Sequence, residues 1–265
     1  MIPTDLISTY SDMVYLVGFF VFLLGSSIGS FINVVVDRLI HSQPLTGRSH
    51  CDSCKKTLQW QDLVPIVSYV LLHGNCRYCH KKLSLQHPVV EALTGIIFVV
   101  TWYIAPLPSL VLYWGIVSCA WIIVLADIRY QLISDYMQIA LFVSIFLLKF
   151  TLGATFFSLL SDVVNAFLVA FPIWLIYYLS RERAMGQGDV FIAAQIGFLL
   201  GAISGYLALY SAFVLGAAVG VFLIVTGKKK MKSAVPFGPF LIAGATVVVL
   251  FGSPVLHMIQ RLYHF

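Results

Sequence analysis

Charged residues are scarce in this sequence, and their scarcity decides the class of protein. Only 10% of the 265 residues are Asp, Glu, Lys or Arg, whereas 60% are hydrophobic, and the mean hydropathy is +0.94. Soluble domains carry about 25% charged residues, so this balance excludes an ordinary soluble domain. No internal repeat or low-complexity tract is apparent. The composition predicts an all-α polytopic membrane protein.

A cleavable secretory signal is also missing. The first apolar run is preceded by Asp5 and Asp12 instead of a basic flank, and no small-residue cleavage site follows it. We therefore expect this run to be retained as the first transmembrane helix. About eight transmembrane helices are expected, of which the fourth, sixth and eighth are short against the ~20 residues that span a bilayer. The runs are residues 14–36, 89–105, 111–126, 136–150, 163–179, 190–200, 206–226 and 240–251.

The basic residues are distributed unevenly between the two sides of this predicted topology. If the chain alternates sides through eight spans, one face holds all of the 16 lysines and arginines except Lys149 and Arg261. Basic residues stay preferentially in the cytoplasm, so this face is predicted to be cytoplasmic. Basic loops against an anionic lipid bilayer account for the net charge of +5, and no nucleic-acid partner is expected.

Four of the five cysteines lie in one polar loop, residues 38–88. They form two C-x-x-C pairs, Cys51 with Cys54 and Cys76 with Cys79, separated by 21 residues. This spacing is typical of four thiolates around one tetrahedral zinc ion, and it predicts a small zinc-ribbon-like loop domain. Two disulfides or four spare thiols are the alternatives, but thiols stay reduced in the cytoplasm.

Two aspartates stand at the ends of predicted spans, on the predicted cytoplasmic side. Asp127 ends the third span, and Asp189 begins the sixth after Gly186 and Gly188. Carboxylates in this position are costly and therefore indicate function. Brought together, they would form an acid/base pair able to activate water against an amide. The two glycines lack side chains and would let the backbone beside Asp189 approach a substrate.

Small residues four apart occur twice within apolar runs. Gly25 and Gly29 form the first pair, and Gly216 and Gly220 form the second. This pattern predicts close packing of each helix against a neighbour.

Taken together, these motifs resemble the type IV prepilin peptidase family, the bacterial GxGD aspartyl proteases. The resemblance covers almost the whole chain, and the residues that carry it occur in the family's order. They are GSFINVVVDRL at residues 29–39, RSHCDSC at 48–54, LVPIVSY at 63–69, GNCRYC at 74–79, HPVVE at 87–91, ADIRYQLISD at 126–135, GQGD at 186–189 and PFGPF at 236–240.

The resemblance implies a function and a location. Such an enzyme cleaves the leaders of prepilins and pseudopilins after a glycine, at the cytoplasmic side of the bacterial inner membrane. In many members the new amino terminus is then N-methylated from S-adenosylmethionine. The catalytic pair is implied to be Asp127 and Asp189, with Asp135 as a secondary candidate whose alternative role is helix N-capping. The implied organisation is a first helix at 1–37, the zinc loop at 38–88 and the protease bundle at 89–265.

Some residues depart from the family pattern, and some roles stay open. Ser134 replaces a usual proline, Ala184 a frequent glycine and Phe191 a common lysine; none of these changes removes a catalytic carboxylate. No glycine-rich nucleotide motif of a soluble methyltransferase is found, so the methyl-donor site is unassigned.

Acidic residues on the predicted cytoplasmic side are candidates to receive a basic prepilin leader. They are Asp52, Asp62 and Glu91, and the alternative for Glu91 is an interfacial ion pair. The alternative for the whole chain is a polytopic transporter or scaffold with a cytoplasmic zinc module.

Overall fold

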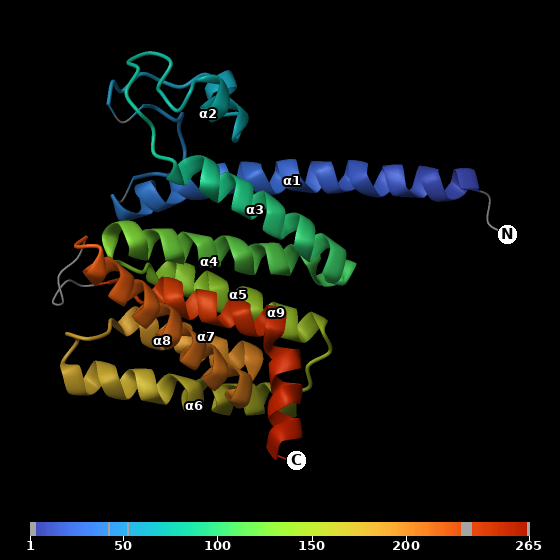
Figure 1. The fold of residues 1–265 in the computed structure, drawn as a ribbon, viewed down its shortest axis with the longest axis vertical. Coiled ribbons are helices and arrows are strands. Elements are labelled where there is room, and N and C mark those ends of the chain that lie inside the picture. The colour runs from blue at the N-terminus through green and yellow to red at the C-terminus, as the bar shows by residue number, and fades with distance from the viewer. Residues whose placement is uncertain (1–3, 42, 52, 229–234, 264–265) are drawn as a thin grey trace. The chain divides into compact units, whose positions relative to one another are not determined.

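The protein folds into long helices joined by short connections, except for the cysteine-bearing loop over residues 41–85 (Figure 1). The computed structural model describes residues 4–41, 43–51, 53–228 and 235–263, with helix side chains from residue 13 to residue 252 except at position 40. Among the residues named above, Asp52 lies outside these ranges. The long helices are α1 (Thr4–Ile40), α3 (Gln86–Ile104), α4 (Leu110–Tyr130), α5 (Asp135–Thr151), α6 (Phe156–Ser180), α7 (Gln187–Leu200), α8 (Ala202–Val225) and α9 (Gly238–Tyr263).

These eight helices coincide with the eight predicted apolar runs. Five segments are long and apolar enough to cross a membrane within the described part of the chain: Met13–Leu39, Gln86–Ile104, Leu107–Tyr130, Phe156–Ser180 and Ala202–Val225. The three short runs become α5 with 17 residues, α7 with 14, and an apolar helix over Gly238–Gly252 in α9. No strand occurs in the described ranges. The prediction of an all-α polytopic membrane protein is therefore confirmed.

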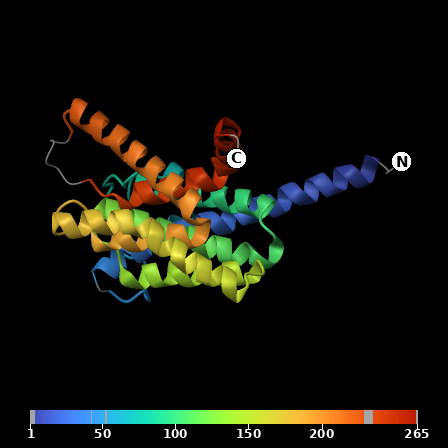
Figure 2. The same ribbon diagram turned by 90° about the horizontal axis from the view of Figure 1, so that it is seen from below.

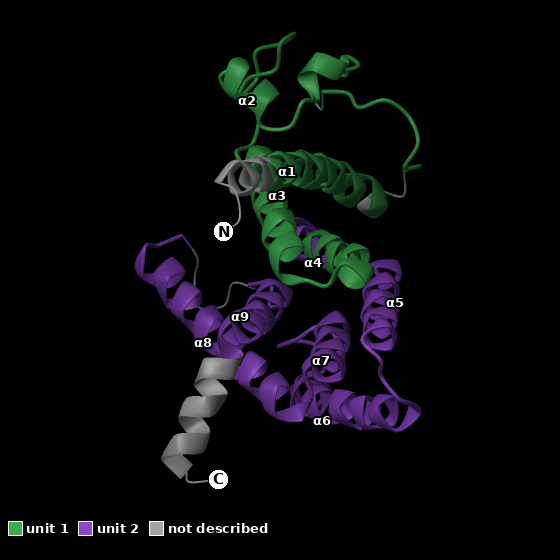
Figure 3. Cartoon of the chain, turned by 90° about the vertical axis from the view of Figure 1, so that its right-hand side faces the viewer, with its two compact units in different colours: residues 1–122 green, residues 123–265 purple. Residues whose placement is uncertain are grey.

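The chain divides into two compact units, residues 1–122 and 123–265 (Figure 3). In the first unit α1 packs along α3, and glycines set how closely they approach. A Cβ on Gly25 would come within 2.8 Å of Phe98, and one on Gly29 within 2.8 Å of the Glu91 backbone. The close packing predicted for this pair of glycines is confirmed.

In the second unit α6 packs on α7 and α8 packs on α9 (Figures 1 and 2). The close approach between α8 and α9 occurs at Gly244, where a Cβ would collide with the carbonyl oxygen of Ala208. Gly220 has nothing within 4 Å of its Cβ position, and a Cβ on Gly216 would make an ordinary contact with Phe240. The close packing predicted for this second pair is therefore wrong, since the pattern marks small residues but not the face that meets a neighbour.

Pro172 lies inside α6 and explains one contact between helices. Proline has no N–H, so the carbonyl oxygen four residues earlier, on Leu168, loses its helical partner. The hydroxyl of Tyr206 in α8 donates to this oxygen at 2.8 Å. The helix keeps its backbone hydrogen bonding complete, as an apolar environment demands.

Candidate active site and metal centre

The four cysteines of the loop converge in the first unit. The Sγ atoms of Cys51, Cys54, Cys76 and Cys79 all lie within 4.8 Å of one another. In a tetrahedral zinc site with Zn–S distances of ~2.3 Å the sulfurs stand about 3.8 Å apart. The Sγ atoms of Cys51 and Cys79 are separated by 3.8 Å. The described cysteines are all free, so disulfides are absent from this part of the chain and the cluster can hold a metal ion.

Two knuckles with the same backbone pattern build this cluster. In the first, the N–H of Cys51 donates to the carbonyl oxygen of Lys56, and the N–H of Lys55 donates to the carbonyl oxygen of Cys51. In the second, 25 residues later, the N–H of Cys76 donates to the carbonyl oxygen of Lys81, and the N–H of His80 donates to the carbonyl oxygen of Cys76. Bridges between His50 and Thr57 and between Asn75 and Lys82 complete the match. The two knuckles thus share one backbone pattern, although only the cysteines and a few neighbours are identical between them.

The knuckles favour thiolate formation at Cys51. The backbone hydrogen bond from Cys54 is the largest of several hydrogen bonds that lower the pKa of Cys51 to about 6, against the opposing effect of burial. A thiolate is the form that binds a metal. The donor set and its spacing therefore both fit a zinc ion.

Acidic side chains tie the loop together instead of facing a free surface. The Asp62 carboxylate accepts the Arg77 Nε–H at 2.6 Å and the Tyr78 hydroxyl at 3.3 Å, which joins the short helix η1 (Trp60–Asp62) to the second knuckle. Glu91 in α3 is buried, and its Oε2 accepts the N–H of Ile66 at 2.7 Å. These contacts give both residues structural roles.

Arg38 has a role that the sequence did not reveal. Its guanidinium is largely buried at the end of α1 and donates to five consecutive carbonyl oxygens, of residues 44–48, at 2.7–3.4 Å. A single side chain therefore fixes the path of the chain into the first knuckle.

The two predicted catalytic aspartates come together in the second unit. Asp127 lies in the last turn of α4, and Asp189 lies in the first turn of α7. Both are 6% exposed, and their carboxyl groups interact electrostatically. Asp127 Oδ2 accepts the N–H of Gly238 at 3.0 Å, while Asp189 Oδ2 accepts the N–H of Gly186 at 3.2 Å. The other oxygen of Asp189, Oδ1, is buried without a hydrogen-bond partner.

The glycines of this site do different things. A Cβ on Gly188 would come within 2.8 Å of the Ile133 side chain, so this glycine packs α7 against the connection between α4 and α5. A Cβ on Gly186 would meet only Asp189 Oδ2, at 3.9 Å, so the space beside it is open. Gly238 had not been singled out from the sequence; its PFGPF run gave the only signal.

Asp135 differs from the buried pair in its exposure. It is exposed at the first residue of α5, and the N-cap is Ser134, so the expected N-capping role of Asp135 is wrong. A carboxylate in the first turn still meets the helix dipole favourably.

A buried amide chain supports the first turn of α7 and was also missed. Gln138 in α5 donates from Nε2 to the carbonyl oxygen of Gly188 at 3.0 Å. Gln195 in α7 in turn donates to the Gln138 backbone and side-chain oxygens at 3.0 and 2.9 Å. Both glutamines are polar residues within apolar helices, which was the available signal.

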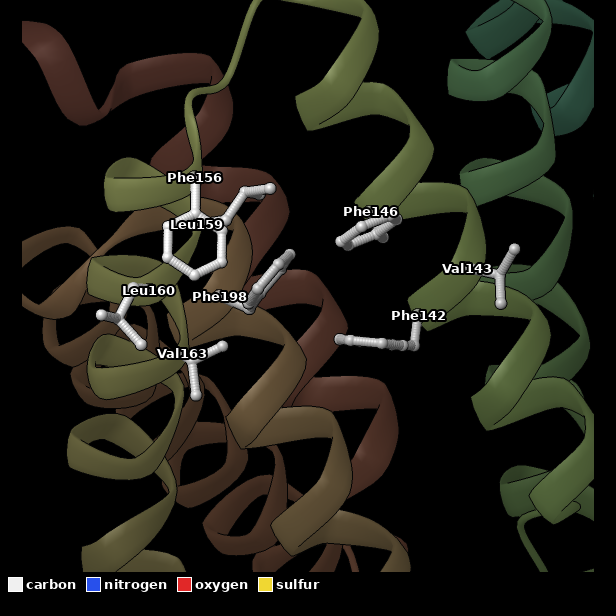
Figure 4. Close-up of a pocket in the computed structure, with 8 residues that line it drawn as sticks. All are labelled: Phe142, Val143, Phe146, Phe156, Leu159, Leu160, Val163 and Phe198. Carbon is white, nitrogen blue, oxygen red and sulfur yellow. The ribbon is translucent and has the colours of Figure 1, made fainter.

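An apolar pocket of about 440 Å³ lies apart from this chemistry (Figure 4). Phe, Leu and Val side chains of α5, α6 and α7 line it, and neither aspartate takes part. It offers no hydrogen-bonding group to a peptide.

Comparison with known proteins places the chain in a family. Residues 23–105 match the model described as the bacterial peptidase A24 N-terminal domain, and residues 114–221 match the type IV leader peptidase family. A prepilin leader peptidase/N-methyltransferase of Klebsiella pneumoniae is 32% identical over 71% of this chain and 86% of the relative. One from Pectobacterium carotovorum subsp. carotovorum is 31% identical over 84% of this chain and 88% of the relative, and one from Bacillus subtilis (strain 168) is 28% identical over 89% and 94%. No solved structure matches the chain. The chain therefore belongs to the type IV leader peptidase family.

Proposed function

We propose that this protein cleaves the leaders of type IV prepilins and pseudopilins after a glycine and then N-methylates the new amino terminus. The family assignment and the names of the relatives support this function. The observation that carries it is the buried, interacting pair of Asp127 and Asp189. A protease family also speaks against the transporter or scaffold alternative.

The hydrogen bonds around the pair suggest separate roles for the two carboxyl groups. Each carboxyl group accepts one backbone N–H, so the difference between them lies in their other oxygen atoms. In this proposal Asp127 is ionised and takes a proton from the attacking water. Asp189 has a buried Oδ1 without a partner, which is a costly place for negative charge. Asp189 therefore carries the proton and donates from Oδ1 to the scissile carbonyl, because two close carboxylates cannot both ionise cheaply. The open space beside Gly186 is where the substrate strand approaches.

In this proposal zinc has a structural role. Cys51, Cys54, Cys76 and Cys79 would hold it and so fold the 38–88 loop, whose only buried apolar side chains in the described ranges are Cys51 and Cys76. S-adenosylmethionine is the proposed methyl donor, supported by the methyltransferase names of the relatives. We also propose the three-part organisation expected from the sequence, with the first helix at 1–37 and the protease bundle at 89–265.

The proposed location is the bacterial inner membrane, with the loop and the aspartates facing the cytoplasm. The support is the uneven distribution of lysines and arginines and the apolar helices within the described ranges. The proposed substrates carry basic leaders, and the lipid bilayer is the other partner.

The test is processing of a prepilin with a lysine-containing leader by the purified protein in liposomes. Asp127→Asn and Asp189→Asn should each abolish cleavage, while Asp135→Asn, an exposed carboxylate of the same region, should retain it. Mass spectrometry of the product identifies cleavage after glycine and any added methyl group. Processing by either Asn variant of the pair would exclude the proposed dyad, and an unmethylated product would remove the second activity.

A further inference from the structure

A stripe of exposed apolar side chains runs along residues 60–71 of the zinc loop. Trp60 is 75% exposed, Val70 64% and Leu71 71%. These side chains are therefore not part of a core inside the loop. The exposed members lie in η1, in the non-helical link after it and in the short helix α2 (Val67–Leu71). They are Trp60, Leu63, Val64, Val67, Val70 and Leu71.

The opposite side of the same segment is held by the protein through polar contacts. The Asp62 side chain is only 3% exposed and is paired with Arg77. The N–H of Ile66 is bound by Glu91, and the Tyr69 hydroxyl donates to the carbonyl oxygen of Leu83 at 3.4 Å. The exposed stripe itself carries no charged side chain. The segment is therefore fixed to the protein by polar contacts, while its large apolar side chains stay exposed.

The middle of the segment is bonded to the first turns of α3, the helix that packs along α1. Ile66 precedes α2 (Val67–Leu71) and is bonded to Glu91, whose backbone lies against Gly29. Gly29 lies inside the span Met13–Leu39, ten residues before its end. Ten helical residues correspond to about 15 Å, and Figure 1 shows α2 set back along α1 from its end. The segment is therefore attached at the level of residues that belong to a candidate span.

We propose that residues 60–71 form an interfacial anchor, lying in the bilayer leaflet at which the 38–88 loop emerges, with its apolar stripe between the acyl chains. The partner is the phospholipid bilayer itself. Trp60 has the side chain that favours the boundary between headgroups and acyl chains. The exposed Lys55 and Lys56 immediately before the segment suit anionic headgroups. The anchor holds the metal knuckles against the membrane surface.

The test uses the full-length protein in nanodiscs that contain lipids brominated near the headgroup end of the acyl chains. The chain has five tryptophans, so the Trp60 signal is taken as the fluorescence difference between wild type and Trp60→Phe. We expect that difference to be quenched at least threefold more strongly by brominated lipid than by aqueous iodide. A Trp60 signal quenched mainly by iodide, or shielded from both quenchers by a protein partner, would overturn the anchor.

A second variant tests the stripe as a unit. Val67→Asn together with Val70→Asn should lower lipid quenching of Trp60 at least twofold, whereas Leu85→Asn, which is 68% exposed and lies outside the segment, should leave it unchanged. Zinc content reports whether the loop remains folded. Unchanged quenching in the double variant, or an equal fall in the Leu85 control, contradicts the proposal, and the wild-type measurement decides alone if the double variant loses its zinc.

Discussion

Replacing Gly238 by alanine gives a sharp test of the active-site geometry. The new Cβ would stand 2.8 Å from Asp127 Oδ2, whereas ordinary contacts begin at 3.4 Å, so the carboxylate or the start of α9 must yield by about 0.6 Å, the difference between these distances. Misplacing a catalytic group by about 1 Å can lower a rate about 100-fold. We therefore expect kcat to fall about 10- to 100-fold, with KM nearly unchanged.

The fold should survive this change. The backbone of Gly238 is not in the left-handed region, so alanine can adopt its conformation. Gly220→Ala is the matched control, because nothing lies within 4 Å of its Cβ position. The assay is steady-state cleavage of a prepilin in detergent. Wild-type kcat in Gly238→Ala, or an equal loss in Gly220→Ala, would refute the reasoning.

Three further predictions concern the supports of the two sites. Gln138→Leu leaves the Gly188 carbonyl oxygen unpaired, which should lower the free energy of unfolding by about 1–3 kcal/mol and also lower kcat. Thermal unfolding and cleavage assays measure the two effects, and wild-type stability and kcat would contradict the prediction. Metal analysis should find one zinc ion per chain in the wild type, and none after chelation or in Cys54→Ser. If the variant held as much zinc as the wild type, Cys54 would not be a zinc ligand. Arg77→Ala leaves the buried Asp62 carboxylate without its charged partner and should weaken the loop by about 1 kcal/mol, seen as faster zinc loss to a chelator; an unchanged rate would show that the ion pair contributes nothing.

The features that the sequence predicted well depend on local patterns. Eight apolar runs became eight helices because an apolar stretch in a membrane must pair its backbone groups within itself, even where it is short. The cysteine spacing predicted the cluster, since two C-x-x-C pairs bring their own knuckle geometry.

The features that were missed depend on partners far along the chain. Gly238 matters because it binds Asp127, 111 residues away, and Gln138 matters because it binds Gly188, 50 residues away. Periodicity within a helix cannot identify such pairs. The failed packing at Gly220 has the same cause, because the spacing of small residues does not tell which side of a helix meets another helix.

The bond between Asp127 and Gly238 also has a consequence for biosynthesis. One of the paired carboxylates belongs to α4, and the N–H that it accepts belongs to the first residue of α9. Both aspartates are therefore made before the backbone donor that holds Asp127. The pair can reach its observed geometry only after synthesis has reached α9.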